Sequence, residues 1–281
     1  MRANADCERF QTGVAEYAAY LETPEGRLRL DLAFANLQEV LPQATRSLNA
    51  LDIGSGTGVT AVRLARLGLH VTLLDASAPM LDFAKRAAQE AGVTDRVVLT
   101  HGDAAQLASL FDAGSFDLVL CHNILEYVEY PCAVLRSAAR VVRDAASLLS
   151  VLVRNRAGEV FKAAIHDGDL TATEHNLTAE WGQESLYGGR VRLFTAERLQ
   201  AMLRESSLTM AAQHGVRVLS DYLPTSVSRN DQYERILELE RKLGRRPEFA
   251  AVARYTHCLA RRAPPDCEDS SQADPIMKDG A

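Results

Sequence analysis

Three glycines at alternate positions, Gly54, Gly56 and Gly58, follow a short apolar segment and precede an apolar pattern with helical spacing. Asp52 comes just before them, and Asp75 ends the next apolar segment. A strand, a glycine turn and a helix form the nucleotide-binding start of a doubly wound α/β fold. Glycine lets the backbone turn sharply and approach a ligand closely. An acid at the end of the second strand can accept both ribose hydroxyls of an adenosine.

The spacing D-x-G-x-G-x-G, which begins at Asp52, differs from the G-x-G-x-x-G of dinucleotide sites. It resembles the class I S-adenosylmethionine (SAM) methyltransferases, with a Rossmann dehydrogenase as the alternative. The resemblance implies SAM as the cofactor, with its methionine part on the glycine turn and its ribose on Asp75. It also implies a Rossmann-like sheet of seven mostly parallel strands, with helices on both faces.

Bulk properties narrow the class of protein. The chain has 281 residues, is 47% hydrophobic and carries a net charge of −6. It contains no apolar run of membrane-spanning length and no signal-peptide core at the N-terminus. Its five cysteines include no CxxC pair, which favours a reducing cytoplasm and argues against a structural metal. The acidic balance is not typical of a general nucleic-acid binder.

Elements alternate along most of the chain. We expect strands at 49–53, 70–75, 96–101, 115–122, 147–153, 208–219 and 250–260, and helices at 77–92, 131–142, 195–206 and 231–243. Residues 1–47 are expected to form a helical lid, interrupted at 23–26. Residues 48–261 would form the SAM-binding domain, with an irregular, substrate-covering insertion at 154–194. Residues 262–281 have the composition of a disordered tail.

Several blocks beyond the glycine turn carry a narrower resemblance. They are Gly26-x-x-Arg29, His122-x-x-Leu125-Glu126-Tyr127-Val128, Gly215-Val216-Arg217-Val218-x-x-Asp221-Tyr222-Leu223, Tyr233-Glu234-x-x-Leu237-Glu238-Leu239-Glu240 and Ala253-Arg254-Tyr255-x-His257. Together they resemble the tRNA 5-carboxymethoxyuridine methyltransferase family over about residues 15–261. The resemblance implies esterification of the carboxylate of a modified wobble uridine.

Candidate cofactor contacts follow from these resemblances. Asp103 would accept the adenine amino group, although an aspartate there is also a good helix cap. His122 ends the fourth strand, where ligands of open α/β sheets bind. Arg29 is placed to reach the SAM carboxylate. The full set is Arg29, Asp52, Gly54, Ser55, Gly56, Gly58, Asp75, Ala76, Asp103, Ala104 and His122.

Candidate substrate contacts are Arg154, Trp181, Arg217, Tyr222, Arg254, Tyr255 and His257. A carboxylate acceptor is ionised at neutral pH and needs no general base. An arginine would orient it, because the guanidinium fork matches a carboxylate. We therefore assign His122, Arg217 and Arg254 as catalytic candidates. His122 or His257 could act as a base if the acceptor were a hydroxyl or an amine.

The acceptor itself is left open among three hypotheses. The part of the insertion around 179–184 contains no lysine, although a tRNA-binding segment would gain from positive charge. We therefore favour methylation of a small carboxylate-bearing metabolite. Methylation of tRNA is the alternative, and a non-catalytic SAM-binding regulator is the third.

Overall fold

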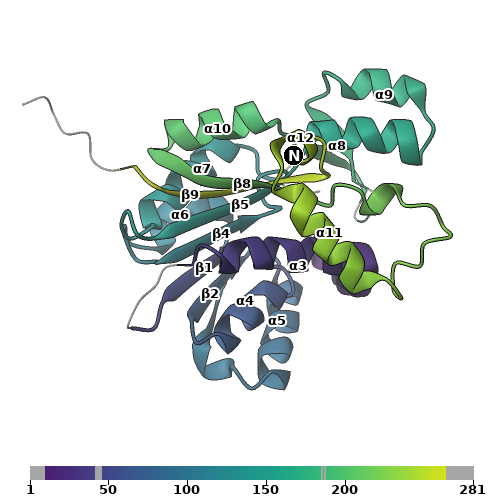
Figure 1. The fold of residues 1–281 in the computed structure, drawn as a ribbon. Helices are drawn as coiled ribbons and strands as arrows, with labels where there is room; N and C mark the ends of the chain where they lie inside the picture. Colours follow the sequence, from purple (N-terminus) through teal and green to yellow (C-terminus); the bar gives the residue numbers. More distant parts are fainter. Residues whose placement is uncertain (1–9, 42–45, 185, 187, 264–281) are drawn as a thin grey trace, which may run out of the picture.

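The computed structural model describes residues 10–41, 46–184, 186 and 188–263. A seven-stranded sheet in the order β3-β2-β1-β4-β5-β9-β8 forms its centre (Figure 1). β9 runs antiparallel to both of its neighbours, β5 and β8, whereas the remaining strand pairs of this sheet are parallel. The expected sheet is confirmed. Its strands are β1 (Asn49–Ile53), β2 (His70–Asp75), β3 (Val97–His101), β4 (Leu118–His122), β5 (Leu148–Arg154), β8 (Leu208–Val216) and β9 (Tyr255–Arg262).

Helices cover both faces of this sheet (Figure 1). Val119 and Cys121 of β4 pack in the core cluster that includes residues of α7 and α10. Leu118 and Leu120 pack in the cluster that includes residues of α4 and α5. Successive strand residues point to opposite faces, so a strand buried on both faces is apolar throughout. These helices are α4 (Val59–Arg66), α5 (Ala78–Glu90), α6 (Leu107–Leu110), α7 (Pro131–Val141) and α10 (Ala196–Glu205).

The N-terminal segment forms two helices, α2 (Val14–Glu22) and α3 (Pro24–Gln38). Thr23 ends the first and caps the second, because its side chain accepts a hydrogen bond from the Gly26 amide at 3.1 Å. Gly26 is required here, since a Cβ would lie 2.1 Å from the carbonyl oxygen of Tyr20. The break was predicted at residues 23–26, but it is confined to Thr23, because Pro24 already begins the second helix. Beyond it, α3 packs against α11 (Tyr233–Gly244) through an apolar cluster.

The insertion is more regular than expected. It contains α8 (Arg156–Phe161), a π-helical turn (Lys162–His166), α9 (Leu170–Asn176) and a hairpin of β6 (Trp181–Gln183) and β7 (Arg190–Arg192). Asn155 and Asp169 cap the two helices. Each element is too short to produce a visible hydrophobic period, which explains why the sequence pattern did not reveal them. In Figure 1, α8 and α9 project beyond one end of the sheet.

The C-terminal boundaries also differ from the prediction. The last strand begins at Tyr255, five residues later than expected (255 − 250), because Pro247–Ala250 forms the short helix α12. Its proline occupies the first turn, where a missing amide donor costs nothing. The predicted tail at 262–281 begins with the end of β9, and residues 264–281 lie outside the described part of the chain. No helix among the described residues is long and apolar enough to cross a bilayer.

Candidate active site

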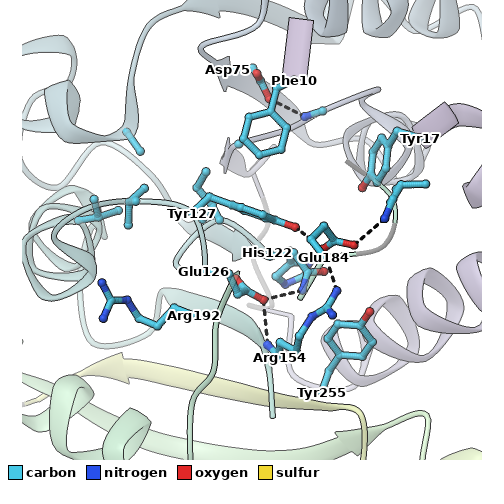
Figure 2. Close-up of a pocket in the computed structure, with 18 of the residues that line it drawn as sticks. Phe10, Tyr17, Asp75, His122, Glu126, Tyr127, Arg154, Glu184, Arg192 and Tyr255 are labelled. Atoms are coloured by element: carbon cyan, nitrogen blue, oxygen red, sulfur yellow. Dashed lines mark hydrogen bonds and ion pairs between the residues drawn. The ribbon is translucent and has the colours of Figure 1, made fainter. Parts of the chain in front are cut away.

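A cavity of about 1420 Å³ opens at the carboxyl ends of the central strands (Figure 2). Its wall comes from the sheet, from the N-terminal helices and from the insertion. Such a volume exceeds the usual 300–1,000 Å³ range of small-ligand pockets. Many predicted site residues line it: Arg29, Gly54, Gly56, Asp75, Ala76, Asp103, Ala104, His122, Arg154, Trp181, Arg217, Arg254 and Tyr255.

The glycine turn is bound to the neighbouring strand. The amides of Gly54 and Ser55 both donate to the carbonyl oxygen of Leu74, at 2.8 and 3.2 Å. Gly54 has a φ of 68°, and a Cβ there would lie 2.8 Å from the side chain of Ile124. Glycine alone satisfies both the left-handed backbone and the close contact. The turn therefore presents bare backbone to the cavity.

Asp75 faces the same cavity from the end of β2. Its Oδ2 accepts from the Gly56 amide and its Oδ1 from the Ser77 amide, each at 2.8 Å. A carboxylate has about four lone-pair sites, so acceptor capacity remains for the hydroxyls of a ligand. Burial raises the pKa of Asp75 despite these hydrogen bonds.

Three predicted cofactor residues lie behind the turn and do not line the cavity. Asp52 is 5% exposed, and burial together with the charge of Asp75 raises its pKa to about 7. Gly58 begins α4, and a Cβ there would lie 2.7 Å from the Cβ of Ala84. The Ser55 hydroxyl is buried without a hydrogen-bond partner among the described residues. Asp52 and Gly58 shape the turn from behind.

Asp103 forms the expected helix cap. Its Oδ1 accepts from the Ala105 amide at 2.7 Å, and its own amide donates to the Gln106 side chain at 3.1 Å. This reciprocal arrangement is a capping box. The same residue lines the cavity beside Ala104. Capping thus fixes the carboxylate at the cavity wall, and its contact with an adenine stays a prediction.

The two candidate histidines are in different environments. His122 lines the cavity, and its Nε2 lies 2.7 Å from the Ser150 hydroxyl. Burial and the nearby Arg29 lower the pKa of His122 to about 3. His257 is completely buried and bonds Ser150 and Asn36, so it does not reach the cavity. Tyr222 also lies outside the wall, with its hydroxyl 3.4 Å from the Gly158 carbonyl oxygen.

Three of the predicted arginines belong to one buried ion-pair network. Arg154 contacts Glu184 at 2.9 Å and Glu159 at 3.2 Å. Arg254 lies 3.2 Å from Glu159 and 3.1 Å from Asp221. Asp221 also binds Arg217, at 2.5 Å. Each guanidinium therefore already has a carboxylate partner, which limits what Arg217 and Arg254 can offer to a substrate.

Three other cavity arginines have no carboxylate at ion-pair distance among the described residues. Arg29 is 8% exposed, and its guanidinium lies 3.2 Å from the Tyr17 hydroxyl and 5.1 Å from the centre of the Tyr20 ring. Arg190 and Arg192 lie over the ring of Trp181, at 4.9 and 4.4 Å from its centre. Burying a cation without a counter-ion is unfavourable, so the position of Arg29 suits an anionic ligand group. Arg190 is exposed and Arg192 is half-buried, so both are accessible to a ligand.

Several cavity residues were not assigned from the sequence. They are Phe10, Tyr17 and Tyr20 near the N-terminus, Glu126 and Tyr127 after β4, and Glu184 in the insertion. The Tyr127 hydroxyl donates to Glu184 at 2.9 Å, which joins the loop after β4 to the hairpin (Figure 2). Glu126 and Tyr127 lie within one of the family blocks, and this was the available signal. The tyrosines of α2 had none.

The comparisons with known proteins agree with this geometry. A model described as "Methyltransferase domain" matches residues 51–150. The tRNA 5-carboxymethoxyuridine methyltransferase of Escherichia coli (strain K12) is 31% identical over 250 residues, which cover 85% of this chain and 90% of that protein. The chain belongs to this family of class I SAM-dependent methyltransferases. It is an enzyme that uses SAM, as expected.

Other relatives define the wider group. A ubiquinone biosynthesis O-methyltransferase of Maricaulis maris (strain MCS10) is 32% identical over 172 residues, 60% of this chain and 62% of that protein. A solved SAM-dependent methyltransferase of Thermotoga maritima, titled a possible histamine N-methyltransferase, covers 92% of this chain and 99% of its own, with a TM-score of 0.60 and 16% identity. A putative SAM-dependent methyltransferase of Listeria monocytogenes gives a TM-score of 0.59 at 17% identity, over 85% of this chain and 100% of its own. These structures establish the fold.

Proposed function

We propose that this methyltransferase esterifies the carboxylate of a modified wobble uridine in tRNA. The observation that carries the proposal is the distribution of paired and unpaired arginines in one cavity. The deep cluster is neutralised by acids, whereas Arg190 and Arg192 flank an indole ring without a carboxylate partner among the described residues. Unstacked RNA bases bind on aromatic rings, and guanidinium groups match carboxylates and phosphates.

The cofactor half of the cavity fits SAM. Arg29 is the buried cation that lacks a counter-ion in the described chain, and it would bind the SAM carboxylate. Asp75 retains acceptor capacity and would bind the ribose hydroxyls, and Asp103, which lines the same cavity, would accept the adenine amino group. SAM supplies a methyl group bound to a cationic sulfur. When the methyl group is transferred, the sulfur leaves as a neutral thioether and needs no acid to protonate it.

The protein's own contribution is positioning. A carboxylate acceptor is already ionised at neutral pH, so no residue has to remove a proton. The rate then depends on holding the carboxylate, the methyl carbon and the sulfur in line while excluding water. A continuous contact joins the sheet edge to the hairpin that carries Trp181, and it is formed by Tyr127, Glu184 and Arg154. This contact would close one side of the reaction site.

Basic residues from separated segments meet at the cavity. We therefore favour tRNA over a small metabolite as the methyl acceptor. Lys162, Arg190, Arg192 and Arg229 all line it, although no short stretch of sequence is rich in lysine. Lys162 lies 3.6 Å from Asp167 and Arg229 lies 3.3 Å from Glu25, so Arg190 and Arg192 are the two of these cations without a carboxylate partner among the described residues. Phosphate binding depends on local rather than total charge. A small carboxylate-bearing metabolite remains the second candidate, because the whole chain carries a net charge of −6.

The test is methyl transfer to tRNA isolated from cells that lack the family enzyme, followed by mass spectrometry of the nucleosides. We expect a methyl ester on 5-carboxymethoxyuridine. The double variant Arg190→Ala/Arg192→Ala should raise KM for tRNA about 10-fold or more and leave KM for SAM unchanged. Arg204→Ala, an exposed arginine on α10, is the matched control. Turnover of the free nucleoside but not of tRNA would favour the second candidate.

A further inference from the structure

A chain of hydrogen bonds connects His122 to the N-terminal helix α3. His122 Nε2 lies 2.7 Å from the Ser150 hydroxyl, which lies 2.8 Å from His257 Nε2. His257 Nδ1 in turn lies 3.3 Å from the amide nitrogen Nδ2 of Asn36. Ser150 and His257 are completely buried, and Asn36 is 3% exposed. Water therefore does not compete for these groups.

Donor and acceptor chemistry gives this chain a direction. An amide nitrogen can only donate, so His257 Nδ1 accepts from Asn36. Burial holds the pKa of His257 well below its usual range, so the ring is neutral and its one proton lies on Nε2. That proton is donated to the Ser150 oxygen. The single hydroxyl proton of Ser150 is then directed to His122 Nε2.

We propose that Asn36, His257 and Ser150 are positioning residues that fix His122 in its Nδ1–H tautomer, so that its ring offers a hydrogen-bond donor to an anionic oxygen of a bound ligand. Nδ1 has no partner among the described residues, and His122 lines the cavity (Figure 2). The inference does not depend on which acceptor is methylated. It goes beyond methyl transfer itself by assigning a role to residues that never touch the ligand.

In this tautomer His122 cannot act as a general base. Its Nε2 lone pair is occupied by the Ser150 hydroxyl, and its other nitrogen carries the proton. A donor suits a carboxylate oxygen, whereas a hydroxyl or amine nucleophile would need a proton acceptor. The oxygen bound by Nδ1–H can belong to the carboxylate of SAM or to the carboxylate of the acceptor. The tautomer is the same in both cases.

The direct test is nitrogen NMR of the full-length protein labelled with ¹⁵N-histidine, with the His122 signals assigned by His122→Asn. We expect His122 to show a protonated, pyrrole-type Nδ1 and an unprotonated, pyridine-type Nε2. His257 should show the opposite pattern. A pyridine-type Nδ1 on His122 would overturn the proposal, because the chain would then run in the other direction.

Two variants test whether the chain determines the tautomer. In Asn36→Asp a carboxylate replaces the amide donor, so His257 must present Nδ1–H and His122 should change to Nε2–H. Ser150→Ala removes the link and should give a mixture of tautomers. Ser206→Ala is the matched control, because it deletes a buried hydroxyl that bonds the Met202 carbonyl oxygen at 2.8 Å, outside the chain. An unchanged His122 spectrum in both test variants would show a merely structural role.

Ligand addition identifies the oxygen. If S-adenosylhomocysteine alone shifts the Nδ1–H resonance of His122, the donor serves the cofactor carboxylate. If the shift requires an acceptor carrying a carboxylate, the donor serves the acceptor. No shift with either ligand would contradict the proposed donor role. In activity assays Ser150→Ala should lower kcat by about 10-fold, with a pH profile that stays flat between pH 6 and 8.

Discussion

Asp221 binds Arg217 through two contacts of 2.8 and 2.5 Å from one carboxylate oxygen to the guanidinium. Its other oxygen lies 3.1 Å from Nε of Arg254. All three side chains are less than 10% exposed. Arg217 also has a φ of 60°, which is uncommon for a residue with a side chain. Asp221 thus joins two buried arginines that line the cavity.

The first prediction concerns this contact. Asp221→Ala leaves the buried Arg217 without a carboxylate partner among the described residues and leaves Arg254 with Glu159 alone, and it should lower the free energy of unfolding by about 3–5 kcal/mol. Urea denaturation followed by circular dichroism measures the change. Glu238→Ala removes an exposed partner of Lys242, at 3.2 Å, and should change stability by less than about 0.5 kcal/mol. Equal effects of the two substitutions would show that the buried ion pair contributes no more to stability than the exposed one.

A second prediction follows from Asp117, which precedes β4. Burial alone would raise the pKa of Asp117, but hydrogen bonds from Arg46, Asn49 and Arg143 lower it to about 2. A lowered folded pKa stabilises the protein above the unfolded pKa of about 4, and this stabilisation is lost as pH falls toward 2. The contribution at pH 7 should be on the order of 2 kcal/mol.

Thermal unfolding of the wild type and of Asp117→Asn at several pH values measures this effect. The difference in Tm should be largest above pH 5 and should shrink steadily between pH 4 and 2. Asp82→Asn, at an exposed position of α5, serves as the control for general acid effects. A difference that stays constant down to pH 2 would contradict the assigned pKa.

The third prediction concerns Asp52, whose contribution to stability changes with pH in the opposite direction to that of Asp117. Burial and the charge of Asp75 raise the pKa of Asp52 to about 7. The stability linked to the neutral acid is full below about pH 4 and is lost as pH rises through 7. The ligand-free variant Asp52→Asn should therefore match the wild type near pH 4 and exceed it by roughly 2–4 kcal/mol above pH 7.

Bound SAM should reduce the stability difference between the wild type and Asp52→Asn, because a cationic ligand near the turn favours the ionised form of Asp52. Calorimetry from pH 6 to 7.5 should show affinity for SAM rising with pH in the wild type and staying nearly flat in Asp52→Asn. Proton release on binding, measured in buffers of different ionisation enthalpy, gives an independent check. A wild-type affinity that falls over this range would contradict the prediction.

The sequence predicted what depends on neighbouring residues. The glycine turn, Asp75 and the interruption of the N-terminal helix near Thr23 are local, since each is determined by a few consecutive residues and their backbone requirements. The side-chain network of the site is not local. Arg154 and Glu184 are 30 residues apart, and Asn36 and His257 are 221 apart. No spacing rule relates such pairs, so the sequence could suggest arginines but not their partners.

The same reason explains why the structure favours different arginines as ligand contacts from those that the sequence suggested. Arg217 and Arg254 stood out because they belong to recognisable blocks, but the folded chain pairs both with acids. Arg190 and Arg192 were not among the predicted site residues. They are left without a carboxylate partner among the described residues because the hairpin turns them toward Trp181. Whether a charge is available to a ligand depends on its counter-ions.

Arg29 provides the last prediction. Its guanidinium lies within the N-terminal helices and bonds the Tyr17 hydroxyl, but no acid pairs with it in the described chain. Arg29→Ala should weaken SAM binding about 100-fold, the loss expected for a buried charge-assisted contact. It should leave the binding of 5′-methylthioadenosine, which has neither the carboxylate nor the amino group, within about 2-fold of the wild type. Calorimetry with both ligands measures this contrast.

The matched control is Arg27→Ala on the same helix, because Arg27 lies over the ring of Tyr233 and does not line the large cavity. It should change neither affinity. An equal loss for both ligands in Arg29→Ala would indicate that the substitution has disturbed α3 as a whole, and the assigned carboxylate contact would then be wrong. A loss confined to SAM identifies the buried arginine as the group that recognises the amino-acid end of the cofactor, because only that end differs between the two ligands apart from the sulfur's charge.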